Sequence, residues 1–136
     1  MRTVAVPIFE NQAYYRGVEL GLTEALKKQI EWRTPYKVVV QQRCDTVLSG
    51  QIDRITQGTL SRRRDGGLPQ DMEYRIIVSF EWKDLRSGKI LRQRVGMEVV
   101  APYVPAHPVG ETLAVGQYRA VQRVAERIVS VMIDDM

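Results

Sequence analysis

The chain has 136 residues, of which 44% are hydrophobic and 26% charged, so its composition is that of one globular domain and excludes an intrinsically disordered chain. Its single cysteine, Cys44, excludes an internal disulfide and a multi-cysteine metal site, and its single histidine, His107, leaves little for zinc or histidine-based catalysis. The net charge of +4 favours anionic partners without selecting one. No apolar run resembles a signal peptide or a membrane-spanning helix, which leaves open a cytoplasmic protein or one whose signal has been removed.

The first 40 residues predict a β-α-β unit. Residues 4–9 are apolar on both faces apart from Pro7, which favours a buried strand with the proline where no ladder N–H is needed. A helix of about 16–18 residues ending near Arg33 follows, because apolar residues recur at helical spacing until Thr34-Pro35 stops the helix. Residues 36–40 then form a second strand.

The middle of the chain predicts strands alone. Residues 47–55 form a strand in which Gly50 marks a bulge or a close backbone approach. Residues 73–83 alternate clearly between apolar and polar positions, and residues 89–99 return as their hairpin partner after a turn. We expect one apolar face on each strand, composed of Tyr74, Ile76, Val78, Phe80 and Trp82 on the first and of Leu91, Val95, Met97 and Val99 on the second.

A final helix is predicted from about Thr112 to Ile133 by the helical spacing of its apolar residues. The order β-α-β-β-β-β-α indicates a single α+β domain over residues 1–136, with a mixed sheet of four to five strands and two helices packed on one face. One long basic loop lies at about residues 58–71. A loop of this length is usually either functional or mobile.

Catalytic and cofactor-binding arrangements are missing from the sequence. A nucleophile needs a base and an orienting group within hydrogen-bond reach, and Cys44 and His107 are far apart in the chain. The pair Gly66-Gly67 lies between two strands, whereas a phosphate-binding loop lies between a strand and a helix. We therefore predict a non-enzymatic protein without metal or cofactor.

Arginines are the most suggestive feature of the chain, because guanidinium groups bind phosphate and carboxylate in a bidentate manner. Residues 54–94 hold ten basic and five acidic residues, so the positive excess belongs to the strands and the basic loop. Period-two alternation predicts that the strand arginines lie opposite the core-facing apolar sets and form a basic sheet face. The candidate anion-binding residues are Arg62, Arg63, Arg64, Arg75, Arg92 and Arg94.

Two other roles are compatible with arginines in these positions. The basic loop can equally be a solvated hairpin tip that charge keeps soluble. A nucleic-acid surface would interleave aromatic residues with the cations, but Tyr74, Phe80 and Trp82 fall on the apolar face. Nucleic acid is therefore not predicted as a partner.

The sequence resembles the lipopolysaccharide-assembly lipoprotein family LptE along nearly its whole length. The resemblance is carried by residues 4–11 (VAVPIFEN), 17–26 (GVELGLTEAL), 33–39 (RTPYKVV) and 45–52 (DTVLSGQI), and it ends with a strand pair and the helix that contains residues 125–129 (AERIV). The first strand and its exit also resemble CsgG-like and LpoB-like envelope lipoproteins. These would bind or activate another envelope protein.

The resemblance to LptE implies a protein that is lipid-anchored on the periplasmic side of the outer membrane. It implies a plug inside the β-barrel LptD that helps to deliver lipopolysaccharide to the cell surface, with positive residues near lipid A phosphates. The family's N-terminal signal and acylated cysteine are absent from this sequence, since Cys44 is internal. We therefore expect the lipid anchor to lie outside it.

Overall fold

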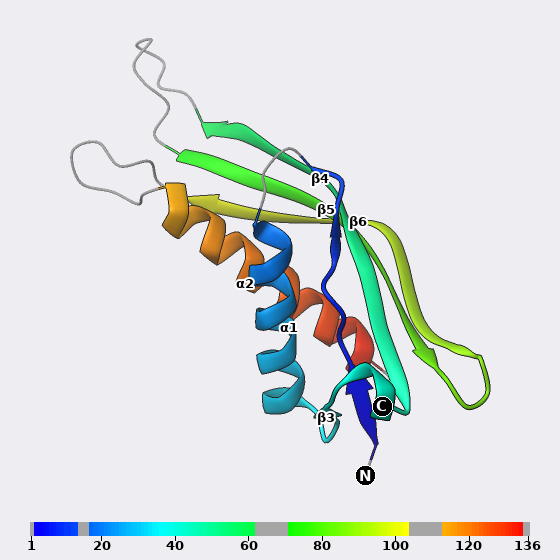
Figure 1. The fold of residues 1–136 in the computed structure, drawn as a ribbon. Helices are drawn as coiled ribbons and strands as arrows, with labels where there is room; N and C mark the ends of the chain where they lie inside the picture. Colours follow the sequence, from blue (N-terminus) through cyan, green and yellow to red (C-terminus); the bar gives the residue numbers. More distant parts are fainter. Residues whose placement is uncertain (1, 14–16, 62–70, 104–112, 135–136) are drawn as a thin grey trace.

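The computed structural model describes residues 2–13, 17–61, 71–103 and 113–134 and confirms an α+β domain (Figure 1). Two helices lie together on one side of a long, bent sheet. The elements in chain order are β1 (Thr3–Ala5), β2 (Glu10–Asn11), α1 (Val18–Arg33), β3 (Lys37–Val38), a 3-10 helix (Gln41–Arg43), β4 (Thr46–Ser61), β5 (Asp71–Asp84), β6 (Ile90–Tyr103) and α2 (Leu113–Ile133).

The sheet is mixed and has six strands, whereas the sequence predicts four to five. Its order is β3-β1-β4-β5-β6, and β2 pairs with β4 further along. β1 runs parallel to both β3 and β4, and β4, β5 and β6 form an antiparallel meander. The extra strand is β2, which lies just beyond the strand expected over residues 4–9. Within that expected strand only β1 is paired, and it ends at Ala5, two residues before Pro7, which has no N–H to donate to a ladder.

The hydrophobic core lies between the sheet and the two helices, as the alternation of β5 predicts. Each large apolar side chain removed from water there contributes about 1.5–3 kcal/mol to folding. Those of the strands and helices that are almost wholly buried include Tyr74, Ile76, Val78, Phe80, Trp82, Leu22, Leu26, Ile30, Val124, Ile128 and Met132. The predicted core face of β5 and the apolar stripe of α2 are confirmed.

Strands β4 and β5 are longer than predicted, and the segment between them is shorter. β4 continues to Ser61 and β5 begins at Asp71, so the two ends of the loop expected at residues 58–71 are paired strand. Residues 62–70, which hold the rest of that predicted loop, lie outside the described residues. At Gly50, by contrast, the predicted close approach is confirmed, because a Cβ atom there would stand 2.4 Å from the carbonyl oxygen of Ser79.

Two irregularities lie on either side of β5, close to Ser79. The β4 register shifts between Ile52 and Arg54, and the β6 register shifts opposite Ser79, beside Gly96 with a φ of 67°. The Ser79 hydroxyl donates to the Asp53 carboxylate at 2.6 Å and accepts from the Gly96 N–H at 3.0 Å. One side chain therefore ties together both neighbours of β5. Bulges bend strands and increase their twist, which agrees with the bend in the sheet.

Candidate functional site

The candidate anion-binding arginines do not form the single basic face that the sequence predicts. Residues 62–64 lie outside the described residues. Arg75 lies on the sheet face turned away from the helices, and its guanidinium group is 2.8 Å from the Glu73 carboxylate and 3.6 Å from that of Glu98. Because two acids already surround this cation, its charge is largely matched within the protein.

Arg92 and Arg94 lie on the other face of the sheet, the one that the helices cover, so the predicted basic face is wrong. Arg92 is opposite Trp82 and Arg94 is opposite Phe80, and directly paired residues share a face. The reason is the bulge beside Gly96, which adds one residue to β6 and reverses the alternation on one side of it. The same bulge leaves Val95, predicted to face the core, 79% exposed.

The two β6 arginines bind backbone carbonyl groups. Arg92 Nη1 donates to the Leu91 carbonyl at 2.7 Å, and its Nη2 donates to the carbonyl of Asp134 at the end of α2. Arg94 Nη1 donates to the Gln93 carbonyl at 2.8 Å. A cation at a helix C-terminus is favourable because the last carbonyls lack helical partners and carry partial negative charge. Arg92 thus joins β6 to the end of α2.

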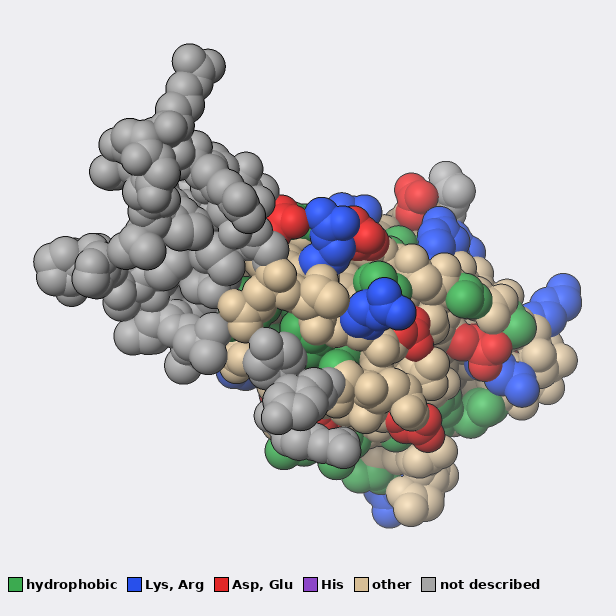
Figure 2. Space-filling model, turned by 90° about the horizontal axis from the view of Figure 1, so that it is seen from above, with side chains coloured by type: hydrophobic (Ala, Val, Ile, Leu, Met, Phe, Trp, Pro, Cys, Tyr) green, Lys and Arg blue, Asp and Glu red, His purple; other side chains and the backbone are tan. Residues whose placement is uncertain are grey.

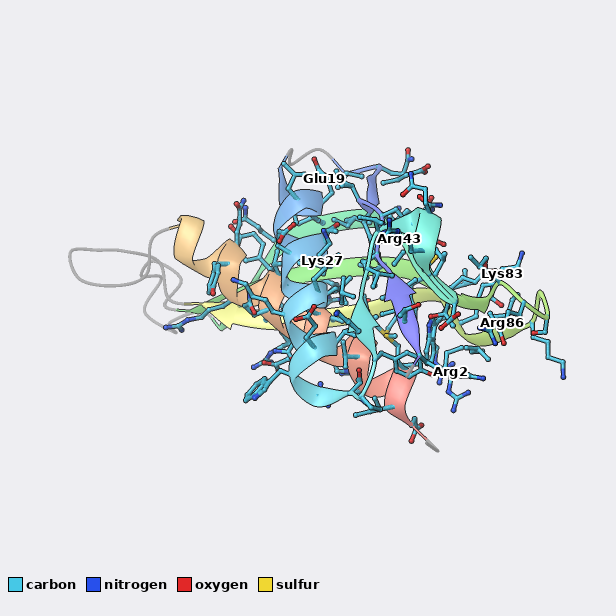
Figure 3. All side chains as sticks on the ribbon, turned by 60° about the horizontal axis from the view of Figure 1, so that its bottom comes forward. Arg2, Glu19, Lys27, Arg43, Lys83 and Arg86 are labelled. Carbon is cyan, nitrogen blue, oxygen red and sulfur yellow. The ribbon has the colours of Figure 1, made fainter. Side chains whose placement is uncertain are left out.

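A second group of cations, none of which is among the candidate anion-binding residues, lies near the β5–β6 turn. We call Arg2, Lys83, Arg86 and Lys89 the hairpin-end cations; Figure 3 labels the first three at this end of the molecule. Arg86 is 82% exposed at its side chain, and its Nη2 is 3.2 Å from Asp45 Oδ1. A polar hollow of about 220 Å³ lies beside it, lined by Arg2, Asp45, Thr46, Asp84 and Arg86.

Asp45 holds this end of the molecule together. The Thr3 N–H donates to Asp45 Oδ2 at 3.2 Å, and the Asp45 N–H donates to Thr3 Oγ1 at 2.8 Å. The Thr3 N–H bond above all, and then the charges of Arg86 and Arg2, hold the pKa of the Asp45 carboxyl below its usual value. The pKa of Arg2 is raised, chiefly by its hydrogen bond with Tyr36, so this arginine keeps its charge.

The hairpin-end cations were detectable from the sequence in part. The turn at residues 84–88 is predicted, so Arg86 and its neighbours could be placed at a hairpin tip. Arg2 could not, because its position depends on β1 lying beside β4. In the view of Figure 2, positive and negative side chains alternate over the described surface and form no continuous basic area.

A mainly apolar groove of about 420 Å³ lies between α1 and α2. Its walls come from Gly17 to Lys28 on the first helix and from Gln117 to Gln122 on the second. The two helices approach each other at Gly21, where a Cβ atom would stand 3.8 Å from Val121 Cγ1, an ordinary contact distance. Tyr118, at the edge of the groove, is mostly exposed.

The described residues hold no cluster of three or more side chains suited to a metal ion. Cys44 is half-buried after the 3-10 helix, where its thiol donates to the Gln41 carbonyl at 3.0 Å, and His107 lies outside the described residues. Neither helix, over the part of it that is described, combines the length and apolar character needed to cross a bilayer.

Solved structures share this fold at low sequence identity. A hypothetical protein from Chlamydia trachomatis matches with a TM-score of 0.61 at 8% identity, over 98% of this chain and 99% of that one. Rare lipoprotein B from Shewanella oneidensis matches with a TM-score of 0.57 at 18% identity, over 98% and 95%. A lipoprotein from Neisseria meningitidis matches with a TM-score of 0.54 at 12% identity, over 98% and 96%. The chain has no significant match among curated proteins.

The fold of this chain places it in a class of small α+β domains in which two helices cover one face of a mixed sheet. Bacterial lipoproteins from Shewanella and Neisseria share this fold. Within that class, the model of the family LptE, described as lipopolysaccharide-assembly, matches residues 1–136. The chain belongs to the LptE family. The resemblance found in its strands and helices is thereby confirmed.

Proposed function

We propose that the chain is a non-enzymatic assembly factor of the Gram-negative outer membrane. It plugs the β-barrel LptD and helps to deliver lipopolysaccharide to the cell surface, and a lipid anchor holds it on the periplasmic side. The observation that carries this proposal is the family match over all 136 residues. The fold of the lipoproteins from Shewanella and Neisseria is compatible with it.

The charge distribution supports a role at an anionic glycolipid. Lys83 and Lys89 are exposed at the hairpin end, and no carboxylate of the described residues forms an ion pair with either. Residues 62–64 add three consecutive arginines in the segment between β4 and β5. Phosphate groups of lipid A are ligands that guanidinium and ammonium groups bind well.

The partner is tested by affinity purification of the anchored protein from its native envelope after mild crosslinking. LptD should be the principal protein recovered, and depletion of the chain should lower the amount of lipopolysaccharide at the cell surface. Recovery of a peptidoglycan synthase or a secretion channel without LptD would contradict the proposal. It would favour the CsgG-like or LpoB-like alternative.

The glycolipid site is tested separately by reversing the charge of residues 62–64 to glutamate. Affinity for lipopolysaccharide should fall roughly tenfold or more, and the wild-type affinity should itself weaken as salt rises. A matched control reverses Lys28, Arg43 and Arg127, three exposed cations elsewhere on the molecule, with the same change in net charge. Equal affinity of the two triple variants would refute the assignment of residues 62–64.

A further inference from the structure

Strand β6 forms one edge of the sheet (Figure 1). Among the described residues it pairs only with β5 over its 14 residues, so its other side offers backbone N–H and C=O groups to an incoming strand. The bulge beside Gly96 divides this edge into two parts, residues 90–94 and residues 97–101, and a second register shift at Leu91 leaves Arg92, Gln93 and Arg94 as the regularly paired stretch of the first part. A bulge interrupts regular pairing, so the two parts act separately.

In the part formed by residues 90–94, the strand's own arginines lie on its carbonyl groups. Arg92 binds the Leu91 carbonyl and Arg94 binds that of Gln93, as described above. Arg94 is exposed, and each of these bonds joins a side chain to the residue before it. The Arg92 bond is partly buried and the Arg94 bond is exposed. The net contribution of such a hydrogen bond to stability is only about 1 kcal/mol, because each group can bind water instead.

The part formed by residues 97–101 is unsuited to an incoming acidic strand. Arg123 reaches from α2 and donates to the Val100 carbonyl at 3.2 Å. Glu98 places a carboxylate on the strand, paired at 3.6 Å with Arg75. An acidic strand would meet a like charge there, whereas residues 90–94 carry two arginines and no acid.

We propose that residues 90–94 of β6 bind an extended, acidic segment of another polypeptide as an additional strand of the sheet. Arg92 and Arg94 are two positions apart on one face, about 7 Å along the strand, so they match carboxylates two positions apart on the incoming segment. As the segment docks, its N–H groups take the carbonyls and its carboxylates take the guanidinium groups. A neutral segment would also displace the arginines from the β6 carbonyls, but it would offer their guanidinium groups no new partner.

The neighbouring residues agree with this occupant. Ile90 is 48% exposed at the start of the strand and can contact an apolar side chain of the segment. When Arg92 releases the Leu91 carbonyl, it can keep its hydrogen bond to the Asp134 carbonyl, so the contact between β6 and the end of α2 is maintained. This site goes beyond the proposed function, because a strand that pairs with β6 need not be the barrel or the glycolipid.

The test uses fluorescein-labelled seven-residue peptides and fluorescence anisotropy with the whole chain. An alternating valine–glutamate peptide should bind saturably. A valine–lysine peptide, and a valine–glutamate peptide with alternate backbone nitrogens methylated, should each bind about tenfold more weakly. Binding should also slow amide exchange within residues 90–94.

The matched variants are R94A and R54A, each of which removes one exposed strand arginine. R94A should weaken the valine–glutamate peptide several-fold and R54A should leave it unchanged, with thermal unfolding confirming that both fold. Equal binding of the methylated peptide would overturn the proposal. So would full competition by millimolar phosphate or by dispersed lipopolysaccharide, which would make the edge a general anion surface. Either result would leave the recovery of LptD, and hence the proposed function, unaffected.

Discussion

Replacing Gly50 with alanine probes the tightest backbone contact between β4 and β5. The new Cβ atom would stand 2.4 Å from the Ser79 carbonyl oxygen, 2.8 Å from Phe9 Cε2 and 3.0 Å from Phe80 Cα. Ordinary contact begins at 3.4 Å, so β4 must move by about 1 Å from the carbonyl or Gly50 must leave the ladder. Neither carbonyl nor Cα can rotate away as a flexible side chain would.

The loss of unfolding free energy can be estimated from the contacts that alanine would disturb. One or two ladder hydrogen bonds are lost or lengthened, at about 1 kcal/mol each. Overpacking against the buried Phe9 ring adds about 1–3 kcal/mol. The G50A variant should therefore lose about 3 kcal/mol of unfolding free energy, which is about 12 °C in Tm for a domain of this size.

A matched control is G21A in α1, where the new Cβ atom lies 3.8 Å from Val121 Cγ1 in ordinary contact. Alanine is a better helix former than glycine, so this variant should gain about 0.5–1 kcal/mol. Urea unfolding followed by far-UV circular dichroism measures both. A loss below about 1 kcal/mol for G50A, or an equal loss for G21A, would refute the reasoning.

Three further substitutions test other contacts. Ser79→Ala removes both hydrogen bonds that join the bulges and should lower the unfolding free energy by about 1–2 kcal/mol, whereas Ser49→Ala on the same face should change it by less than about 0.5 kcal/mol in urea titrations. Thr23→Val leaves the Phe9 N–H without the Thr23 hydroxyl that accepts from it at 3.1 Å, and should lower Tm by several degrees in calorimetry. Because the pKa of Asp45 is depressed on folding, its contribution is present above the unfolded pKa of about 4 and is lost as pH falls through the folded value. Asp45→Asn should therefore lower Tm at pH 7 and approach wild type near pH 2; a constant difference would contradict this.

Features with a local cause were predictable from the sequence. The alternation of β5 identified its core face, because Tyr74, Ile76, Val78, Phe80 and Trp82 recur with period two along an uninterrupted stretch. The stripe on α2 and the close approach at Gly50 likewise follow from nearby residues. A buried α+β core could thus be derived without tertiary information.

Features that depend on distant pairing were not predictable. The period-two alternation that predicts side-chain direction along β6 is broken at Gly96, because the bulge there adds a residue. Arg92 and Arg94 consequently lie on the opposite face of the sheet from the one predicted. The signal was a glycine within a strand, which permits a bulge without proving one. The ends of β4 and β5 were also missed, since polar residues such as Thr59 are held in the strand by pairing with the partner.

The position of β1 has a consequence for how the chain matures during synthesis. β1 lies between β3 and β4 and pairs in parallel with both, yet it precedes both of them in the chain. Its residues, Thr3–Ala5, have no complete set of neighbours until Val47 has left the ribosome, and β4 in turn requires β5. β1 therefore stays without its full set of sheet neighbours until β4 and β5 have been synthesised. The domain closes around its first residues only after most of its chain has been synthesised.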